Sequence, residues 1–206
     1  MYYHTQGPTE VQYSVADPSE KNLVVITQNK RSLILTNDFP EGTYYLPWYS
    51  VPATKSPPKV VLYVTVPEGL QSFTLNGNVC SLDWRGPALE RGFSATIHTG
   101  SVRAPNLTAG TVDAKTSMGS VDITALKAKK VDLSVGTGSI SAKSRKFEGK
   151  VTAHTSVGSC SVEGTTVTSG SAYTRVNGGS EGFVGREGSS GAFKAAVGVG
   201  SVTLQF

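Results

Sequence analysis

Two aspartates, Asp113 and Asp132, have the residue type and spacing that come nearest to catalytic chemistry in this chain. Paired carboxylates about 5 to 9 Å apart act as acid and base in glycosidases, and clustered aspartates hold calcium in polysaccharide-cleaving enzymes. About twenty residues further out on either side, the corresponding positions are held by Ser94 and Thr152, which are neither acids nor bases. Because the pair stands alone, we predict no catalytic residues and no enzymatic activity.

Histidines and cysteines could supply metal ligands or a nucleophile with its base. The three histidines, His4, His98 and His154, fall at unrelated positions, and the two cysteines, Cys80 and Cys160, are isolated in the sequence. Zinc sites and catalytic triads need such residues at defined spacings or with partners brought close. The sequence therefore predicts no metal site, no cofactor and no disulfide framework.

Basic residues form the sharpest charge feature. Seven of the nineteen lysines and arginines fall within 24 positions, opposed only by Asp132 and Glu148. They are Lys127, Lys129, Lys130, Lys143, Arg145, Lys146 and Lys150. Such a cluster is either a solvated turn or a docking patch for an anionic glycan, an acidic polymer or lipid headgroups.

The basic cluster does not resemble a nucleic-acid site, because only Phe147 is interleaved with the charges and base stacking needs more aromatic residues. We predict no specific nucleic-acid partner. Reversing the charge of Lys127, Lys146 and Lys150 is expected to abolish binding to heparin-like or acidic-lipid surfaces.

A group of aromatic residues offers a second candidate for ligand binding. Tyr44, Tyr45, Trp48 and Tyr49 lie in the segment TYYLPWYSVP. Flat amphipathic rings can stack on sugars, and they can equally pack against the body of a protein. Both interpretations, a sugar-binding loop and a packed cap, are compatible with the sequence.

An internal repeat must position the acidic pair and the basic cluster. The pair Gly-Ser recurs at intervals of 19 to 21 residues, and Cys80-Ser81 takes the same place one unit earlier. The pairs begin at Gly100, Gly119, Gly138, Gly158, Gly179 and Gly200. Most residues seven, five and three positions before each pair, and two and four after its first residue, are apolar. An alternation of period two indicates strands with one buried face and one solvated face.

A unit of about twenty residues cannot bury its apolar face alone, but coils stacked at about 4.8 Å bury one another's faces. We therefore predict an all-β protein, a single β-solenoid (β-helix-like) of about seven coils. The glycines would serve a tight corner, with the adjacent serines bonding to the backbone there. At Glu181 the pattern puts a carboxylate in an inward position, so we expect a bulge that turns it outward and returns Phe183 to the core.

The segment before the coils has a different character. Eight of the seventeen aromatic residues precede residue 50, and strands are expected at residues 23–27, 32–36 and 59–66. We predict that residues 1–72 form a β cap over the open end of a solenoid that spans residues 73–206, in one continuous domain.

The last coil ends in Val202, Leu204 and Phe206, which all point inward by the period of two. With coils stacked in sequence order, nothing would cover the edge of this coil, and an uncovered edge invites pairing. The sequence thus predicts self-association through the C-terminal coil, capping by another copy's N-terminal segment, or a native chain that continues past residue 206.

Composition narrows the class of protein. The chain has 206 residues, of which 17% are charged and 23 are glycine, a balance that disfavours helices. No apolar run is long enough to span a membrane and no signal peptide is seen. We expect either a cytoplasmic protein or the mature fragment of a surface protein, and the sequence does not decide between them.

The run VVLYVTVPEGLQSFTLNGNVCSLDW, with later units such as TVDAKTSMGSVDITAL, resembles the uncharacterised "putative adhesin" domain family of bacteria and some eukaryotes. The similarity covers about residues 59–206 and implies a β-solenoid, in agreement with the period. It supplies no functional residues.

We expect a non-catalytic, adhesin-like binding protein that presents a rigid surface to a glycan, an anionic surface or a protein partner. The alternative is a structural protein that self-assembles through its solenoid ends.

Overall fold

The computed structural model describes residues 10–15, 24–28, 33–37, 60–65, 69–170, 173–174, 178–185 and 189–206. The chain forms two compact units, one of residues 10–64 and one of residues 1–9 and 65–206.

The described elements are all strands. They are β1 (Glu10–Val15), β2 (Val24–Gln28), β3 (Leu33–Asn37), β4 (Val60–Thr65), β5 (Ser72–Val79), β6 (Leu82–Asp83), β7 (Leu89–Ala104), β8 (Leu107–Ile123), β9 (Leu126–Lys127), β10 (Lys130–Lys143), β11 (Gly149–Glu163), β12 (Thr166–Gly170), β13 (Tyr173–Thr174), β14 (Gly178–Val184) and β15 (Gly191–Gln205). An all-β solenoid was predicted, and it is confirmed.

The N-terminal strands fall close to where the sequence placed them. β2 and β3 form an antiparallel pair, and β4 begins and ends within one residue of its predicted bounds. β1, which pairs with β4, was not predicted. The aromatic segment from Tyr44 to Tyr49 lies outside the described residues. The capping role of residues 1–72 stays a prediction.

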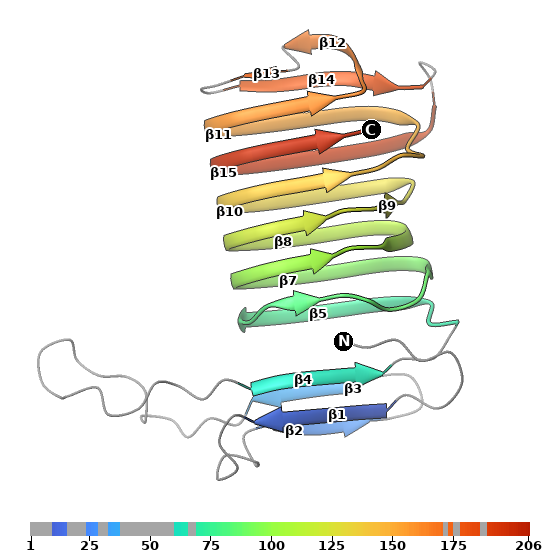
Figure 1. Ribbon diagram of the computed structural model, residues 1–206, viewed down its shortest axis with the longest axis vertical. Helices are drawn as coiled ribbons and strands as arrows, with labels where there is room; N and C mark the ends of the chain where they lie inside the picture. Colours follow the sequence, from blue (N-terminus) through green and yellow to red (C-terminus); the bar gives the residue numbers. More distant parts are fainter. Residues whose placement is uncertain are drawn as a thin grey trace, which may run out of the picture. The chain divides into compact units, whose positions relative to one another are not determined.

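The larger unit is a stack of coils. Its main sheet has the strand order β12-β14-β11-β15-β10-β8-β7-β5 (Figure 1). The neighbouring strands β11, β15, β10, β8, β7 and β5 of this order pair in parallel. Each long strand bends at its Gly-Ser pair, so that its two halves face each other across the core. Six of the seven predicted units, those at Cys80, Gly100, Gly119, Gly138, Gly158 and Gly200, form the parallel layers.

The core follows the period of two that the sequence shows. In β7 the inward residues Phe93, Ala95 and Ile97 precede the corner and Val102 and Ala104 follow it, and all are at most 1% exposed. The residues between them are half-buried or exposed. Because each layer repeats this alternation, the apolar side chains form one continuous core along the stack.

Glycine is required at the bend of each coil after the first. Gly119 and Gly138 have φ angles of 143° and 141°, which L side chains rarely adopt. A Cβ on Gly138 would lie 1.7 Å from the carbonyl oxygen of Gly119 in the layer below. Beside the glycines, the Ser101 hydroxyl donates to the Ser81 hydroxyl at 3.1 Å, and the Ser101 amide also donates to it.

The layers are not stacked in sequence order. β15 lies between β10 and β11, paired in parallel with both, so the chain ends inside the stack (Figure 1). The prediction that the C-terminal coil forms an uncovered edge is therefore wrong. Val202 and Leu204 are buried, and Phe206 is half-buried against the core. The sequence interpretation assumed that consecutive units are neighbours, and this assumption fails twice, between β10 and β11 and between β14 and β15.

The unit around Gly179-Ser180 is the exception to the parallel stack. β14 pairs antiparallel with β11, with Gly179 opposite His154, so this Gly-Ser pair makes no corner. In β14, Ser180 and Gly182 are buried. Glu181 points outward, as predicted, but Phe183 shares its face and does not rejoin the core, which corrects that part of the prediction. The register irregularity lies in the partner strand β12.

Three aromatic rings explain why the C-terminal coil inserts where it does. Phe147, in the connection from β10 to β11, lies 5.7 Å from both Phe193 and Phe206, measured between ring centroids. Phe193 and Phe206 are themselves 5.2 Å apart. Both partners of Phe147 belong to the C-terminal coil, so direct pairing of β10 with β11 would leave that ring without them.

Candidate binding surface

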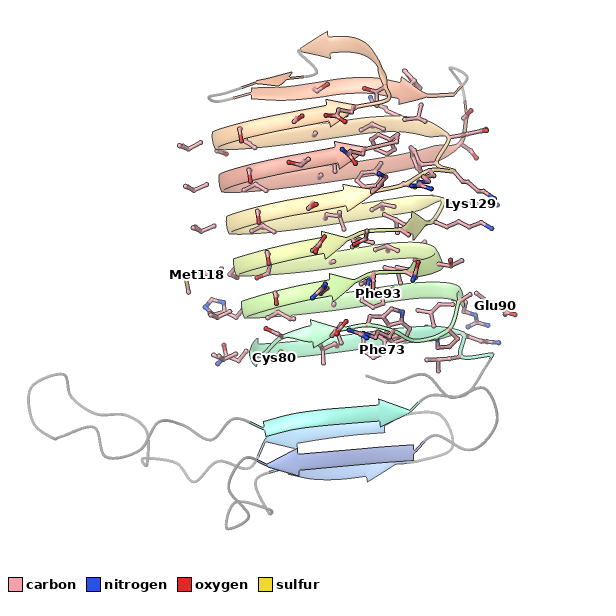
Figure 2. The ribbon with its side chains drawn as sticks, in the orientation of Figure 1. Phe73, Cys80, Glu90, Phe93, Met118 and Lys129 are labelled. Carbon is pink, nitrogen blue, oxygen red and sulfur yellow. The ribbon has the colours of Figure 1, made fainter. Side chains whose placement is uncertain are left out.

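The solenoid has two edges of opposite character. We call the edge where the strands bend at Gly-Ser the Gly-Ser corner, and the edge where one coil passes to the next the turn edge. Figure 2 shows Met118 and Cys80 at the Gly-Ser corner, and Lys129 and Glu90 projecting from the turn edge on the other side. The basic cluster predicted from the sequence belongs to the turn edge, in and around residues 124–130 and 143–150.

A hydrogen bond from a serine side chain holds the two lysine-bearing turns together. The Ser144 hydroxyl donates to the Leu126 carbonyl oxygen at 2.7 Å, which ties the turn that carries Lys146 to the turn that carries Lys127. Leu126 itself pairs with Leu107 one layer below. Because Leu107, Leu126 and Phe147 are buried, the backbone of this edge is anchored from inside while its charged side chains reach solvent.

Most of these cations have no acidic partner. Within the described part of the chain, one member of the cluster forms an ion pair, between Lys150 and Glu181 of β14. The other six, Lys127, Lys129, Lys130, Lys143, Arg145 and Lys146, form none there, and all but the half-buried Lys143 are exposed. Their positive charge is therefore available to an anion from solution.

The inserted coil spreads the positive charge out. Lys130 pairs with Ala192 of β15, and Ala192 pairs with Lys150 on the other side. The two lysines are thus two layers apart, about 10 Å, rather than about 5 Å as they would be in a stack ordered by sequence. Like charges directly opposite destabilise a sheet, so the neutral Ala192 between the two lysines relieves repulsion and widens the patch.

The acidic pair lies on a strand face, where Asp113 borders a shallow hollow. Asp113 and Asp132 are direct neighbours on β8 and β10, as predicted. On the far side Asp132 faces Lys194 of β15, so the expectation that Thr152 flanks it is wrong for the same topological reason. Lys115 donates to Asp113 at 2.9 Å, and this hydrogen bond, with the nearby carboxylate charge, raises the pKa of Lys115.

The Gly-Ser corner, by contrast, carries no formal charge. Its segments, residues 78–81, 98–101, 117–120, 136–139, 156–159 and 198–201, contain no lysine, arginine, aspartate or glutamate. Val79, Met118, Val157 and Val199 stand there between 50% and 74% exposed. The Gly-Ser corner therefore offers no lysine or arginine side chain to attract an anion.

Two shallow hollows, of about 400 and 500 Å³, lie on the outer faces of β5, β7, β8 and β10. None of their lining residues belongs to the basic cluster. Within the described ranges, no three histidine, cysteine or carboxylate side chains come close enough to hold a metal ion. The same ranges contain no helix long and apolar enough to cross a membrane.

Cysteine and histidine stay scattered in the described layers. Burial raises the pKa of both the Cys80 and the Cys160 thiols, and neither forms a disulfide. His98 lies near the Gly-Ser corner, whereas His154 pairs with Ala196 in mid-strand. His4 is outside the described residues.

The sequence interpretation missed the contribution of β15 to the charged surface. Lys194 beside Asp132, and Gln205, which donates to Glu163 at 3.1 Å, enter the surface only because β15 is inserted. A signal was available, since stacking in sequence order would set Lys130 directly opposite Lys150.

Comparison with known proteins supports the fold. The model of the family described as Toastrack DUF4097 matches residues 5–194. A crystal structure of a "putative cell adhesion protein" from Clostridium sporogenes superposes with a TM-score of 0.57 at 12% identity, covering 98% of this chain and 84% of that one. Among curated proteins no match is found.

Proposed function

For this chain, which belongs to the Toastrack DUF4097 family, we propose a non-catalytic binding function in which the turn edge binds an anionic glycan. The observation that carries this proposal is the group of six cations without ion-pair partners on consecutive turns of one edge. A rigid stack holds them at fixed spacing, so their fields add without a large loss of backbone entropy on binding.

A non-catalytic role agrees with the arrangement of the acidic groups. Among the described strands, one adjacent carboxylate pair lies at mid-strand, Asp113 with Asp132, and it is bordered by Lys115 and Lys194. Both carboxylates therefore lie beside a lysine on a strand face, and within the described residues they belong to no group of three histidine, cysteine or carboxylate side chains that could hold a metal ion. The solved structure that superposes on this chain, described as a "putative cell adhesion protein", further supports a binding role.

The test compares two double charge reversals that change net charge equally. K127E/K146E alters the basic cluster of the turn edge, and R91E/R103E alters exposed arginines of β7, which lie in the second layer of the stack and outside that cluster. We expect the first variant to bind heparin, used as the anionic probe, at least about tenfold more weakly at low salt. The control should change the Kd far less.

The salt dependence of the Kd provides a second readout. Because K127E/K146E removes ionic contacts, its slope against the logarithm of salt concentration should be shallower than that of the unchanged chain. Equal weakening by both variants would reduce the effect to net charge and refute a site. Tight binding to vesicles with 30% phosphatidylserine, but not to heparin, would replace the glycan by a lipid surface.

A further inference from the structure

The C-terminal coil, residues 191–206, occupies the space between β10 and β11, which we call the slot. We propose that the slot also accepts the C-terminal coil of a second copy of this chain. Two molecules would then exchange coils and form a dimer in which each slot is filled by its partner. This inference concerns assembly and does not depend on what the turn edge binds.

The slot is built for this coil. β15 forms a parallel ladder with β10 on one side and with β11 on the other. It places Phe193, Val202 and Leu204 in the core, each at most 1% exposed. A second copy carries the same coil, so the partner's coil can make every one of these contacts.

Release of this coil costs less than release of another inner layer. β10 and β11 are consecutive in the chain, and both pair with β15 in the same corner register, with Gly138 and Gly158 on either side of Gly200. If the coil leaves, β10 and β11 can close on each other with glycine facing glycine. The stack then loses one ladder of hydrogen bonds in total. Release of an inner layer whose neighbours cannot close on each other costs the stack two ladders.

The closed slot nevertheless favours reopening. Closure in this register would place Lys130 directly opposite Lys150, and like charges at such positions repel. It would also remove both ring partners of Phe147. A molecule whose slot has closed is thus less stable than one that holds a coil, and the coil of either copy restores the stability.

The two ends of the connection to the coil lie close together, on either side of β11. Val184 of β14 pairs with Gly149 on one side of β11, and Gly191 pairs with Gly149 on the other side. Val184 and Gly191 are therefore two strand spacings apart, about 10 Å, and a stretch of six residues, the number that separates them in the sequence, reaches about 20 Å when extended. An exchanged dimer would display two basic turn edges, which strengthens attachment to a polymeric ligand through avidity.

A buried native thiol allows the exchange to be trapped in the full chain. Cys160 of β11 pairs directly with Val202 of β15, and neighbouring strands bring Cα atoms within the range that a disulfide needs. With C80S in every variant, the donor carries C160A/V202C and the acceptor keeps Cys160 and Val202. A disulfide between donor and acceptor then forms only if the donor's coil enters the acceptor's slot.

The two chains, tagged to differ in size, are incubated together across a wide concentration range and oxidised. Alkaline pH is used because burial raises the pKa of the Cys160 thiol. We expect a covalent donor–acceptor dimer on a non-reducing gel, and its fraction should grow as the protein concentration rises.

Two controls make the result decisive. C80S/V202C in one chain should form an internal disulfide at low concentration, and its failure to do so would overturn the inserted coil on which the proposal rests. A donor with T203C in place of V202C points its thiol outward, opposite Ser161, and should not cross-link. Equal cross-linking by both donors would indicate random collision. An internal disulfide without any mixed dimer would overturn exchange.

Discussion

At the Gly-Ser corner the layers lie so close that a Cβ on Gly138 would collide with the backbone below, whereas at the turn edge lysine side chains extend into solvent. The corner pairs hold one register through all parallel layers. The units differ in length, from 19 to 21 residues, and because the corner register is fixed this difference must be accommodated elsewhere. The register shift between Leu89 and Gly92 lies beside a turn. One edge fixes the stack, and the other is free to vary in length and charge.

The same contrast extends to charge. The segments of the corner have no charged residue, while the turns of β8, β10 and β11 collect most of the unpaired cations of the described layers. Charge at the corner would be repeated every 4.8 Å or so, at a spacing where like charges repel strongly. At the turn edge the inserted coil interrupts that repetition, because Ala192 separates Lys130 from Lys150.

The largest expected effect is at the corner. Gly138→Ala would place a Cβ 1.7 Å from the Gly119 oxygen, at a φ of 141°, so two layers must separate. We expect a loss of about 4 kcal/mol or more in the free energy of unfolding, measured by chemical denaturation. Gly69→Ala is the matched control, since Gly69 has a φ of 83° but nothing within 4 Å of the added Cβ.

That control should cost only about 1 kcal/mol, the strain of a positive φ alone. If Gly138→Ala cost no more than Gly69→Ala, close approach would not be what fixes the corner, and the contrast between the two edges would collapse.

The next largest effect lies beneath the turn edge. Phe147→Ala removes a buried ring. Among the aromatic pairs of the described residues, Phe147 contacts rings of the C-terminal coil alone. The substitution should lower the free energy of unfolding by about 3 to 5 kcal/mol. Hydrogen exchange should rise first in residues 191–206. Phe93→Ala, which breaks the cluster of Phe93 with Phe73 and Trp84, has a similar cost but should raise exchange in β5 and β7. Uniform loss of protection in both variants would show that the coil is no separate unit.

The period of two was readable from the sequence because each layer buries one face and solvates the other. It correctly predicted the all-β solenoid, the inward residues such as Phe93 and Val102, and the glycine corner. It also placed Asp113 beside Asp132, since these two lie on layers that are neighbours both in sequence and in space. The basic cluster was found as well, although its ligand-binding role stays a prediction.

The order of the layers was not readable in the same way. Units that share one inward pattern and one corner residue fit against each other interchangeably, so the local pattern cannot distinguish β11 from β15 as the neighbour of β10. The observed order is favoured by residues that differ from unit to unit, namely Phe147 in a connection, and Lys130 and Lys150, which Ala192 of β15 holds apart. The antiparallel β14 was not predicted for a related reason, because its Gly179-Ser180 pair has the same residues as the pairs that form corners.

The smallest expected effect compares two valines of β15 that lie three residues apart. Val202 is 1% exposed inside the slot, and Val199 is 50% exposed at the corner, between Thr137 and Val157. Val202→Thr buries a hydroxyl among apolar neighbours and should cost about 1 to 2 kcal/mol. Val199→Thr places at the corner the residue that Thr137 already provides one layer away, so denaturation should show a change below about 0.5 kcal/mol. A cost for Val199→Thr as large as that for Val202→Thr would mean that the apolar corner side chains are covered in solution, and the corner would then be a second interface rather than a bare edge.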